Sequence, residues 1–447
     1  MKSKLLISAP ALSLLAALAL PHRLPAQPQP AHYTVTDLGP TDSPFAQATG
    51  ISNNSFVSGF AVVADGTQHA VLWYNGRMID ISKPGLLGPN SGAFGINARA
   101  QVAVQSEINS KDPNNENFCA YGTGLLCRPF FWQGGVYTPL PLLGGNNGAV
   151  NSINAQGAVA GEAENNVRDP ECTLGVEVNG DGPQVLDYEG VIWGPTAGQI
   201  RLLPPLPGDT VSAAMWINDA GQAAGISGRC GNTILPGAVA GPHAVMWDRD
   251  GSVHDLGNLG GTSNPEILAV GNAALAINNA GQVTGVSALP GSKTMHPFLW
   301  TSDKGIQDLG LLPGDLVGAG LAINNQGDIV GASISAPGLA EGNPRAFARL
   351  NGVMHDLNDL VQSDSPLYLL TGFGINDAGE IVGFGADENG NLHGFLATPC
   401  GGNSGADRCP NASASASAEL REHTERAKVV LSENARMLLL QRGLGRH

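Results

Sequence analysis

The sequence predicts an all-β fold, a seven-bladed β-propeller of four-stranded blades that is closed by pairing of its N-terminal and C-terminal strands. Three observations predict it. A nine-residue motif recurs seven times, an apolar-aromatic strand follows every copy, and the two ends of the repeat region carry complementary parts of one unit. The 61 glycines and 30 prolines among 447 residues are typical of a turn-rich β protein.

The repeated motif reads Ile-Asn-x-x-Gly-x-h-x-Gly, where h is apolar. Clear copies begin at Ile153, Ile217, Ile277, Ile323 and Ile375, and degenerate copies begin at Ile51 and Ile96. The spacing of 45 to 64 residues suits a propeller blade. An Asn-led turn with a Gly between two apolar strands predicts a tight hairpin. We therefore expect positive φ angles at the turn glycines Gly157, Gly221, Gly281, Gly327 and Gly379.

A third and a fourth strand follow each motif. The third strands begin at His69, Arg128, Glu189, His243, His296, Arg345 and His393. A Gly shortly after the Trp, as in Trp73 to Gly76, predicts a second hairpin. The fourth strands end in Asp-Leu or a variant of it near Asp80, Leu140, Leu202, Asp255, Asp308 and Asp356. One Asp per unit indicates turn capping rather than a catalytic carboxylate pair.

The two ends of the repeat region predict closure. Tyr33–Leu38 has the pattern of a fourth strand without the three strands that should precede it, and His393–Ala397 is a third strand without a fourth. Pairing these segments would complete the last blade and remove an exposed sheet edge. An open solenoid, the alternative, would need a polar capping unit at each end.

The units resemble those of the HAF-repeat family of extracellular bacterial repeat proteins, named for a His-Ala-Phe triplet at the start of the third strand. The triplet occurs in variant form at His69, His243, His296, Arg345 and His393. The resemblance covers residues 33–397 and implies export and repetition, without a particular activity. Because each unit has at most one such His and nothing clusters them, we interpret the His as a strand-start residue rather than a metal ligand.

The N-terminus predicts export. Lys2 and Lys4 precede an Ala/Leu-rich run from Ala11 to Leu20, and a small-residue cleavage site follows near Ala26. The run is too short for a stable transmembrane helix. We therefore expect a signal peptide at 1–26, no transmembrane span in the mature chain, and a secreted or periplasmic protein; an uncleaved anchor is the alternative.

The remaining chain divides into a propeller of HAF-like repeats at 27–410 and a tail at 411–447. The tail begins as an Ala/Ser-rich flexible linker, and a short C-terminal helix is predicted at Glu419–Gly443, either docked or disordered. The formal net charge is −15; the signal (+3) and the tail (+2) are basic, which leaves −20 on the body. Such a body repels phosphate backbones, so we expect no nucleic-acid partner. Its acidity serves either solubility or cation capture.

Long insertions interrupt the otherwise tight units on one side of the predicted ring. They are the loops between second and third strands of blades 2, 3 and 4 (Ser106–Cys127, Ala163–Tyr188 and Ser227–Pro242) and the blade 4 to 5 connection Gly257–Asn272. Four of the six cysteines lie there. In an exported chain the even count predicts disulfides, and local spacing favours the pairs Cys119–Cys127, Cys172–Cys230 and Cys400–Cys409.

One insertion carries a weak calcium candidate. Glu177, Asn179 and Asp181 precede Gly182 with the alternating spacing of a calcium loop, although Glu stands where Asp is usual and no Glu occupies the twelfth position. An ordinary polar turn is the alternative. We expect no other cofactor.

Two classes of function remain. The first is a non-catalytic binding or scaffold protein that uses the looped propeller face to hold an extracellular glycan, peptide or protein. The second is a loop-sited enzyme such as a glycan-active lyase or hydrolase, for which the sequence has none of the common catalytic motifs. Convergent carboxylates in the central funnel of the looped face would favour the enzyme, and a flat apolar-aromatic surface would favour binding.

Overall fold

A computed structural model describes residues 32–39, 45–172, 184–196, 198–230, 234–235, 238–239, 243–261, 271–291, 294–335 and 344–400. The predicted signal peptide, the calcium candidate formed by Glu177, Asn179 and Asp181, and the C-terminal tail lie outside these residues. No helix within the described ranges is long and apolar enough to cross a membrane.

The described strands group into four-stranded antiparallel units, which we number along the chain. Unit 1 contains β2 (Ala46–Ile51), β3 (Val57–Val62), β4 (Gln68–Tyr74) and β5 (Arg77–Asp80). Unit 2 contains β6 (Ser91–Ile96), β7 (Gln101–Lys111), β8 (Leu125–Gln133) and β9 (Val136–Pro139). Unit 3 contains β10 (Gly148–Ile153), β11 (Val159–Arg168), β12 (Leu186–Trp193) and β13 (Ile200–Leu203). Unit 4 contains β14 (Val211–Ile217), β15 (Ala223–Gly228), β18 (His243–Trp247) and β19 (Val253–Asp255), and its insertion forms a small sheet of β16 (Ile234–Leu235) and β17 (Ala238–Val239).

The later units follow the same strand order. Unit 5 contains β20 (Ala273–Ile277), β21 (Val283–Ala288), β22 (Met295–Thr301) and β23 (Gly305–Asp308). Unit 6 contains β24 (Val317–Ile323), β25 (Ile329–Ile334), β26 (Pro344–Leu350) and β27 (Val353–Asp356), followed by the short helix α2 (Leu357–Leu360). Unit 7 contains β28 (Tyr368–Ile375), β29 (Ile381–Ala386), β30 (Leu392–Pro399) and the N-terminal strand β1 (Tyr33–Asp37). One parallel bridge, Met295 to Val317, joins units 5 and 6 into a single eight-stranded sheet.

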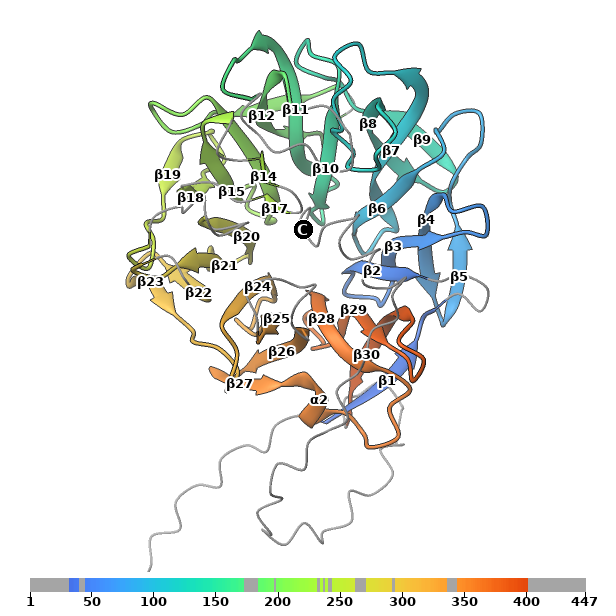
Figure 1. Ribbon diagram of the computed structural model, residues 1–447, viewed down its shortest axis with the longest axis vertical. Helices are drawn as coiled ribbons and strands as arrows, with labels where there is room; N and C mark the ends of the chain where they lie inside the picture. The colour runs from blue at the N-terminus through green and yellow to red at the C-terminus, as the bar shows by residue number, and fades with distance from the viewer. Residues whose placement is uncertain are drawn as a thin grey trace, which may run out of the picture. The chain divides into compact units, whose positions relative to one another are not determined.

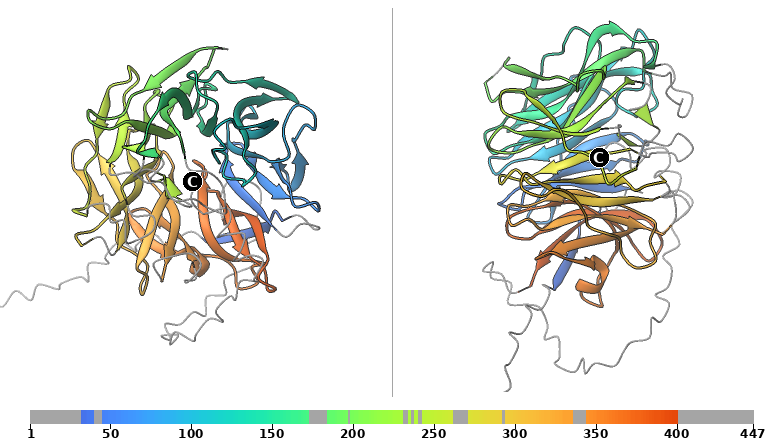
Figure 2. Two further views of the ribbon diagram at one scale, coloured as in Figure 1. Left: turned by 45° about the horizontal axis from the view of Figure 1, so that its top comes forward. Right: turned by 90° about the vertical axis from the view of Figure 1, so that its left-hand side faces the viewer.

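The units follow one another around a central axis, as the blades of a β-propeller do, with the first strand of each unit nearest the axis (Figure 1). The side view in Figure 2 shows their strands running from one face to the other. The predicted pairing of the chain ends is present: β1 pairs with β30 from Tyr33 opposite Pro399 to Asp37 opposite Phe395.

The first Gly of the motif occupies the predicted turn conformation. Gly281 has φ of 73°, and an added Cβ would meet only Gln222 Oε1, at 3.5 Å, so the backbone angle alone favours Gly there. The prediction of positive φ is confirmed at all five glycines: Gly157, Gly221, Gly281, Gly327 and Gly379. In the degenerate copies, Ser55 and Ala100 adopt the same conformation at φ of 62° and 53°.

The second Gly of the motif is required for a different reason, which is the lack of space for a side chain. An added Cβ on Gly285 would lie 1.9 Å from the carbonyl oxygen of Ala273 and 3.0 Å from the ring of Phe298. The aromatic side chain of the third strand therefore packs directly over a glycine of the second strand, where no side chain fits. Phe298 is fully buried, and so are the rings that cover the equivalent glycines of other units: Phe347 and Phe395 at the same strand position, and Trp73, Trp193 and Trp247 two residues further along their strands.

Every inner strand carries a β-bulge at one equivalent position. In β14, for example, the register shifts between Ala214 and Trp216, so Met215 has no cross-strand partner. A bulge re-aims its extra side chain, and these side chains line a residual space of about 20 Å³ on the axis. The equivalent residues are Thr49, Phe94, Asn151, Met215, Leu275, Leu321 and Phe373. Mainly apolar side chains thus fill the channel at this level.

The motif Asn joins each unit to the next. Asn218 Nδ2 donates to the Asn278 carbonyl oxygen at 3.0 Å, and Asn278 Nδ2 donates to the Asn324 carbonyl oxygen at 2.9 Å. The series continues around the axis until Asn376 Nδ2 donates to Ser52 O at 3.1 Å, which connects unit 7 to unit 1. Unit 1 has Ser in place of this Asn, and its link to unit 2 is made instead by Asn54 Nδ2 and Ala98 O, at 2.9 Å.

Candidate functional site

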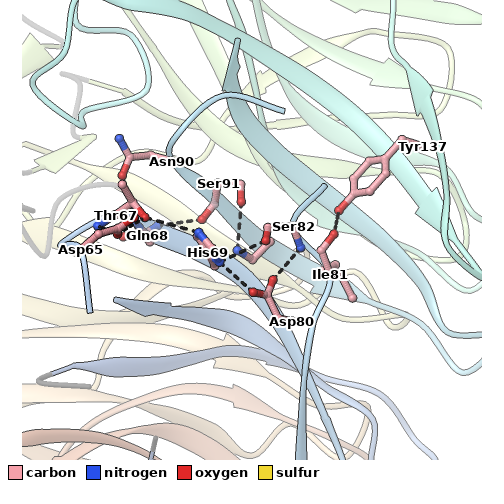
Figure 3. A network of polar contacts seen from close by, with 11 residues as sticks. Asp65, Thr67, Gln68, His69, Asp80, Ile81, Ser82, Asn90, Ser91 and Tyr137 are labelled. Carbon is pink, nitrogen blue, oxygen red and sulfur yellow. Dashed lines mark hydrogen bonds and ion pairs between the residues drawn. The ribbon is translucent and has the colours of Figure 1, made fainter. Parts of the chain in front are cut away.

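The recurrent His and Asp of the repeat contact each other. In unit 1, His69 Nδ1 lies 2.7 Å from Asp80 Oδ2, while Asp80 Oδ1 accepts a hydrogen bond from the Ser82 backbone N–H (Figure 3). The same pair of positions is occupied by His69–Asp80, His243–Asp255, His296–Asp308, Arg345–Asp356 and His393–Asp37, at 2.7 to 3.1 Å. The Asp therefore caps a turn, as predicted, and also pairs with the third strand.

These pairs are part of the repeat structure rather than a site. Each links adjacent strands near the surface, where an ion pair contributes about 0.5 kcal/mol. Among the described residues, the metal-ligating side chains that come together as a group of three are Cys172, Asp187 and Cys230, and no His belongs to that group. Those two cysteines form a disulfide, which occupies both sulfur atoms.

Units 2 and 3 depart from this pattern where their insertions end. At the position of the recurrent His their third strands carry Arg128 and Glu189, and their fourth strands end without the Asp. Burial lowers the pKa of Arg128, and the nearby carboxylates of Glu164 and Asp112 oppose that shift. The basic residue of unit 2 thus faces acidic side chains of the insertions instead of its own fourth strand.

A buried Asn–Glu pair repeats in these two units. In unit 2, Asn90 Nδ2 donates to Glu107 Oε2 at 2.8 Å, and Asn90 Oδ1 accepts from the Gln68 N–H of unit 1. In unit 3, Asn147 Nδ2 donates to Glu164 Oε2 at 3.1 Å, and Asn147 Oδ1 accepts from the Cys127 N–H of unit 2. Each Asn therefore connects its own second strand to the third strand of the preceding unit.

Glu116, in the insertion of unit 2, forms hydrogen bonds with the insertion of unit 3. Its Oε1 accepts hydrogen bonds from the backbone N–H groups of Val185 and Leu186, at 2.6 and 2.9 Å, and Glu116 is fully buried. Asp112 supports the same contact, because Asp112 Oδ2 accepts from Asn147 Nδ2 at 2.8 Å. Buried backbone donors that lose such an acceptor cost about 1–3 kcal/mol each, so Glu116 is a strong constraint on both insertions.

The electrostatics of these carboxylates are unusual. Burial, together with the charge of Glu116, raises the pKa of Glu164 to about 8, against the hydrogen bonds that favour the charged form. Burial also raises the pKa of Glu116. No ion pair formed within the described ranges includes either residue. Neutral amide donors therefore hold two acidic groups that are fully buried.

Disulfides add covalent links to the hydrogen bonds that connect the insertions, and one of them reaches unit 4. We call these links together the bracing of the insertions. Cys119–Cys127 closes the insertion of unit 2, with Cα atoms 5.2 Å apart, and Cys172–Cys230 ties the insertion of unit 3 to that of unit 4, with Cα atoms 4.6 Å apart. Both predicted pairings are present. Cys400 is also disulfide-bonded, while Cys409, its predicted partner, lies outside the described residues.

A second acidic pair lies beside the Cys172–Cys230 bridge. Burial, then the charge of Asp169 and a hydrogen bond with its side chain, raises the pKa of Asp187 to about 7. Thr210 Oγ1 donates to Asp169 Oδ2 at 3.1 Å. A carboxyl group that keeps its proton near neutral pH, as Asp187 does, can exchange that proton with a bound molecule.

The sequence located these elements only in part. It predicted the insertions and the cysteine pairs, and it missed the buried carboxylates. A signal was available: Glu107 and Glu164 each follow the Ile of their motif by 11 residues, and no other unit has an acidic residue there. The predicted insertions are also less loop-like than expected, because β7 and β8 continue into a paired arm as far as Lys111 opposite Leu125.

Comparisons with known proteins add little to this description. No known protein family and no curated protein matches the chain. Among solved structures it is similar to virginiamycin B lyase from Staphylococcus aureus, with a TM-score of 0.44 and 11% identity over 81% of this chain and 99% of that chain. It is similar to YCF48 bound to D1 peptide, with a TM-score of 0.41 and 11% identity over 84% of this chain and 98% of that chain. It is also similar to SapL1 lectin in complex with alpha methyl fucoside, with a TM-score of 0.33 and 13% identity over 70% of this chain and 95% of that chain. These TM-scores are below 0.5 and do not by themselves assign the chain to a class of protein. Its class, a β-propeller protein, is assigned from its strand pairing.

Proposed function

We propose that this chain is an exported binding protein of the HAF-repeat family. Its fold is a closed seven-bladed β-propeller, and the insertions of units 2 to 4 hold an extracellular glycan, peptide or protein. The observation that carries the proposal is the bracing of those insertions. Glu116 ties unit 2 to unit 3, and the Cys172–Cys230 bridge ties unit 3 to unit 4. Pre-organised loops lose less conformational entropy when a partner binds.

The ring closure has two supports. The N-terminal strand β1 completes the sheet of β30, and Asn376 Nδ2 donates to Ser52 O at 3.1 Å across the join. Five four-stranded sheets and one eight-stranded sheet then account for seven blades. Disulfides are compatible with a secreted or periplasmic protein.

The test is a glycan-array and pull-down screen with the mature secreted protein, repeated with variants of the bracing. Glu116→Gln and the double variant Cys172→Ser/Cys230→Ser should bind at least about tenfold more weakly, because the loops must then be ordered on binding. His296→Gln is the matched control, since His296 lies outside units 2 to 4 and its ion pair among the described residues is with Asp308 of its own unit. Normal binding by the two bracing variants, with unchanged circular dichroism, would exclude the insertions as the binding surface.

A second candidate function follows from Asp169 and Asp187. A carboxyl group with a pKa near 7 can act as a general acid at neutral pH, which is consistent with a loop-sited lyase or hydrolase acting on glycans. If this is the function, Asp187→Asn abolishes glycan turnover while leaving glycan binding intact. Equal turnover by the Asp187→Asn variant would exclude this pair as the catalytic group.

A further inference from the structure

The insertions of units 2 to 4 carry their acidic residues inside and their basic residues outside. In the described parts of these insertions, the exposed charged residues are Lys111, Arg168 and Arg229, which are all basic. None of the seven acidic residues there is exposed: Glu107, Asp112, Glu116, Glu164 and Asp187 are buried, and Asp169 and Glu171 are half-buried. The body of the chain is strongly acidic, so a surface whose exposed charges are basic stands apart from it. Such a surface attracts anions.

A short motif repeats in the first two of these insertions. The pattern Glu-x-Asn-x-[Lys/Arg] occurs as Glu107–Lys111 in unit 2 and as Glu164–Arg168 in unit 3. The two copies are structurally equivalent, because the register between the second and third strands shifts after the Glu in both units and pairing resumes at the basic residue in both. Two consecutive units therefore present the same three residues in the same order.

The Asn and the basic residue of this motif are available to a ligand. Asn109 and Asn166 are exposed, and neither side-chain amide forms a hydrogen bond with another described residue. Lys111 and Arg168 form no ion pair within the described ranges. Arg168 Nη2 donates to Asn114 Oδ1 at 2.9 Å, which fixes the guanidinium without neutralising its charge. Each unit thus offers one amide and one cation to solvent.

The insertion of unit 4 continues this series with Arg229. The Arg229 side chain is 55% exposed, and its Nε lies 3.1 Å from Glu171 Oε2 of unit 3. Arg168 of unit 3 contacts Asn114 of unit 2 in the same way. Each Arg therefore reaches back to the insertion of the preceding unit. Three consecutive insertions carry one exposed cation each, and we call Lys111, Arg168 and Arg229 the cation row.

The side chains of the repeated motif match the groups of an acidic sugar. Lys and Arg bind carboxylates, and an amide both donates and accepts hydrogen bonds, as a sugar hydroxyl does. A uronate sugar carries a carboxylate and hydroxyl groups on one ring. Because the pair of Asn and cation recurs in the next unit, the ligand should repeat both groups along its length. A peptide rich in Asp and Glu supplies the carboxylates without the hydroxyl groups.

We propose that the cation row binds a linear glycan built of uronate sugars, with Asn109 and Asn166 bonded to its hydroxyl groups. This inference rests on the proposed function, because it assigns a class of ligand to the same insertions.

The test is isothermal titration of the mature protein with oligosaccharides of galacturonate and of mannuronate. Saturable binding of at least one of them is expected, and it should weaken with added sodium chloride. The methyl-esterified form of that oligosaccharide has the same sugars without the charge and should bind about tenfold or more weakly. Lys111→Gln/Arg168→Gln should weaken binding of the charged form about tenfold, and Asn109→Ala/Asn166→Ala should weaken it several-fold.

The matched control is Arg249→Gln/Lys304→Gln, which should bind as the wild type does. It removes the same two charges from exposed positions between the third and fourth strands of units 4 and 5. Circular dichroism checks that each variant is folded. Since Arg168 also contacts Asn114, Lys111→Gln alone separates a direct contact with the ligand from support of the insertion, and it should weaken binding several-fold.

Three results would overturn the inference. They are no saturable binding of either oligosaccharide up to about 10 mM, beyond the weak end of specific recognition, equal binding by the wild type and by folded Lys111→Gln, and tighter binding of poly-glutamate than of both oligosaccharides. The glycan-array and pull-down screen separates this failure from failure of the proposed function. A different ligand that Glu116→Gln binds weakly would overturn only the uronate assignment, whereas the absence of any ligand that depends on Glu116 would overturn both.

Discussion

His393 Nδ1 lies 2.9 Å from Asp37 Oδ2, and this pair joins the last described strand, β30, to the first, β1, across 356 residues of sequence. The same pair occurs inside single hairpins elsewhere, as in His69–Asp80. At the join between the chain ends, the interaction holds a strand that no hairpin connects to its neighbour. The contact that recurs within single units thus also holds the two ends of the described chain together in unit 7. We call the His393–Asp37 pair the latch.

Removing this latch should loosen β1 selectively. In His393→Ala, we expect faster hydrogen exchange at the Leu38 N–H, which donates to the Gly394 carbonyl oxygen at 2.8 Å, because no hairpin connects β1 to β30 and the other backbone contacts of β1, a bridge from Tyr33 to Val361 and a hydrogen bond from the Gln362 N–H, lie at its far end. His69→Ala is the matched control and should leave exchange in β1 unchanged, since its hairpin stays covalently closed. Equal protection of Leu38 in the two variants would contradict a latch role.

The latch should be strongest in mildly acidic solution. The hydrogen bond that His393 donates to the Asp37 carboxylate raises the pKa of His393, so the His contribution to stability is complete below its ordinary value of about 6.5 and is lost as pH rises through the folded pKa. Burial would raise the pKa of Asp37, but hydrogen bonds from His393 and Gly39 lower it. Its contribution is therefore present above about pH 4 and is lost as pH falls through the folded pKa. Exchange at Leu38 should be slowest, after correction for intrinsic rates, between about pH 4 and 6.5; slower corrected exchange at pH 8 would be inconsistent with this pair.

The acidic pair beside the Cys172–Cys230 bridge should make stability fall with rising pH. Burial and Asp169 raise the pKa of Asp187 to about 7, so the folded chain keeps a proton that the unfolded chain has released. The free energy of unfolding should therefore fall as pH rises from about 4 to about 7. Asp187→Asn cannot titrate and should show a flatter profile in urea unfolding at pH 5 and pH 8. An identical slope in wild type and variant would mean that Asp187 is charged in the folded state.

The two glycines of the motif should respond very differently to Ala. Gly281→Ala should cost about 1 kcal/mol, because only the positive φ opposes the new methyl group. Gly285→Ala should cost about 3 kcal/mol or more, because its Cβ would lie 1.9 Å from the Ala273 carbonyl oxygen. Thermal unfolding of the two variants gives the comparison, with Ala280→Gly as a control in the exposed part of the turn. A similar cost for both would disprove the close approach at Gly285.

The two disulfides should differ in their contribution to stability. The Cys172–Cys230 bridge spans 58 residues and should contribute about 4 kcal/mol, whereas Cys119–Cys127 spans 8 and should contribute about 2.5 kcal/mol. The reason is that a longer closed loop removes more entropy from the unfolded chain. Urea unfolding of the two double Cys→Ser variants measures both values. A larger loss from the shorter bridge would show that native packing, rather than loop entropy, dominates.

The sequence by itself determined the features that depend on local chain geometry. The positive φ at Gly281, the hairpins and the strand boundaries follow from turn chemistry and from the alternation of apolar residues. The pairing of Tyr33–Leu38 with His393–Ala397 could also be predicted, because each segment is an incomplete unit that lacks what the other supplies. Cys172–Cys230 could be predicted because the two insertions belong to neighbouring units.

Only the tertiary structure decided the contacts between units. Glu116 reads as a polar loop residue until the fold places the Val185 and Leu186 N–H groups against it, about 70 residues along the chain. Trp216 is a second case: it stands in an apolar strand of the sequence, and in the structure it lines a pocket of about 170 Å³ at the face formed by the Asn-led turns. Such contacts join residues of different units, and their geometry depends on how the units are rotated about the axis. A local sequence pattern specifies the strands and turns of one unit but carries no information on that rotation, which the packing of all the units sets together.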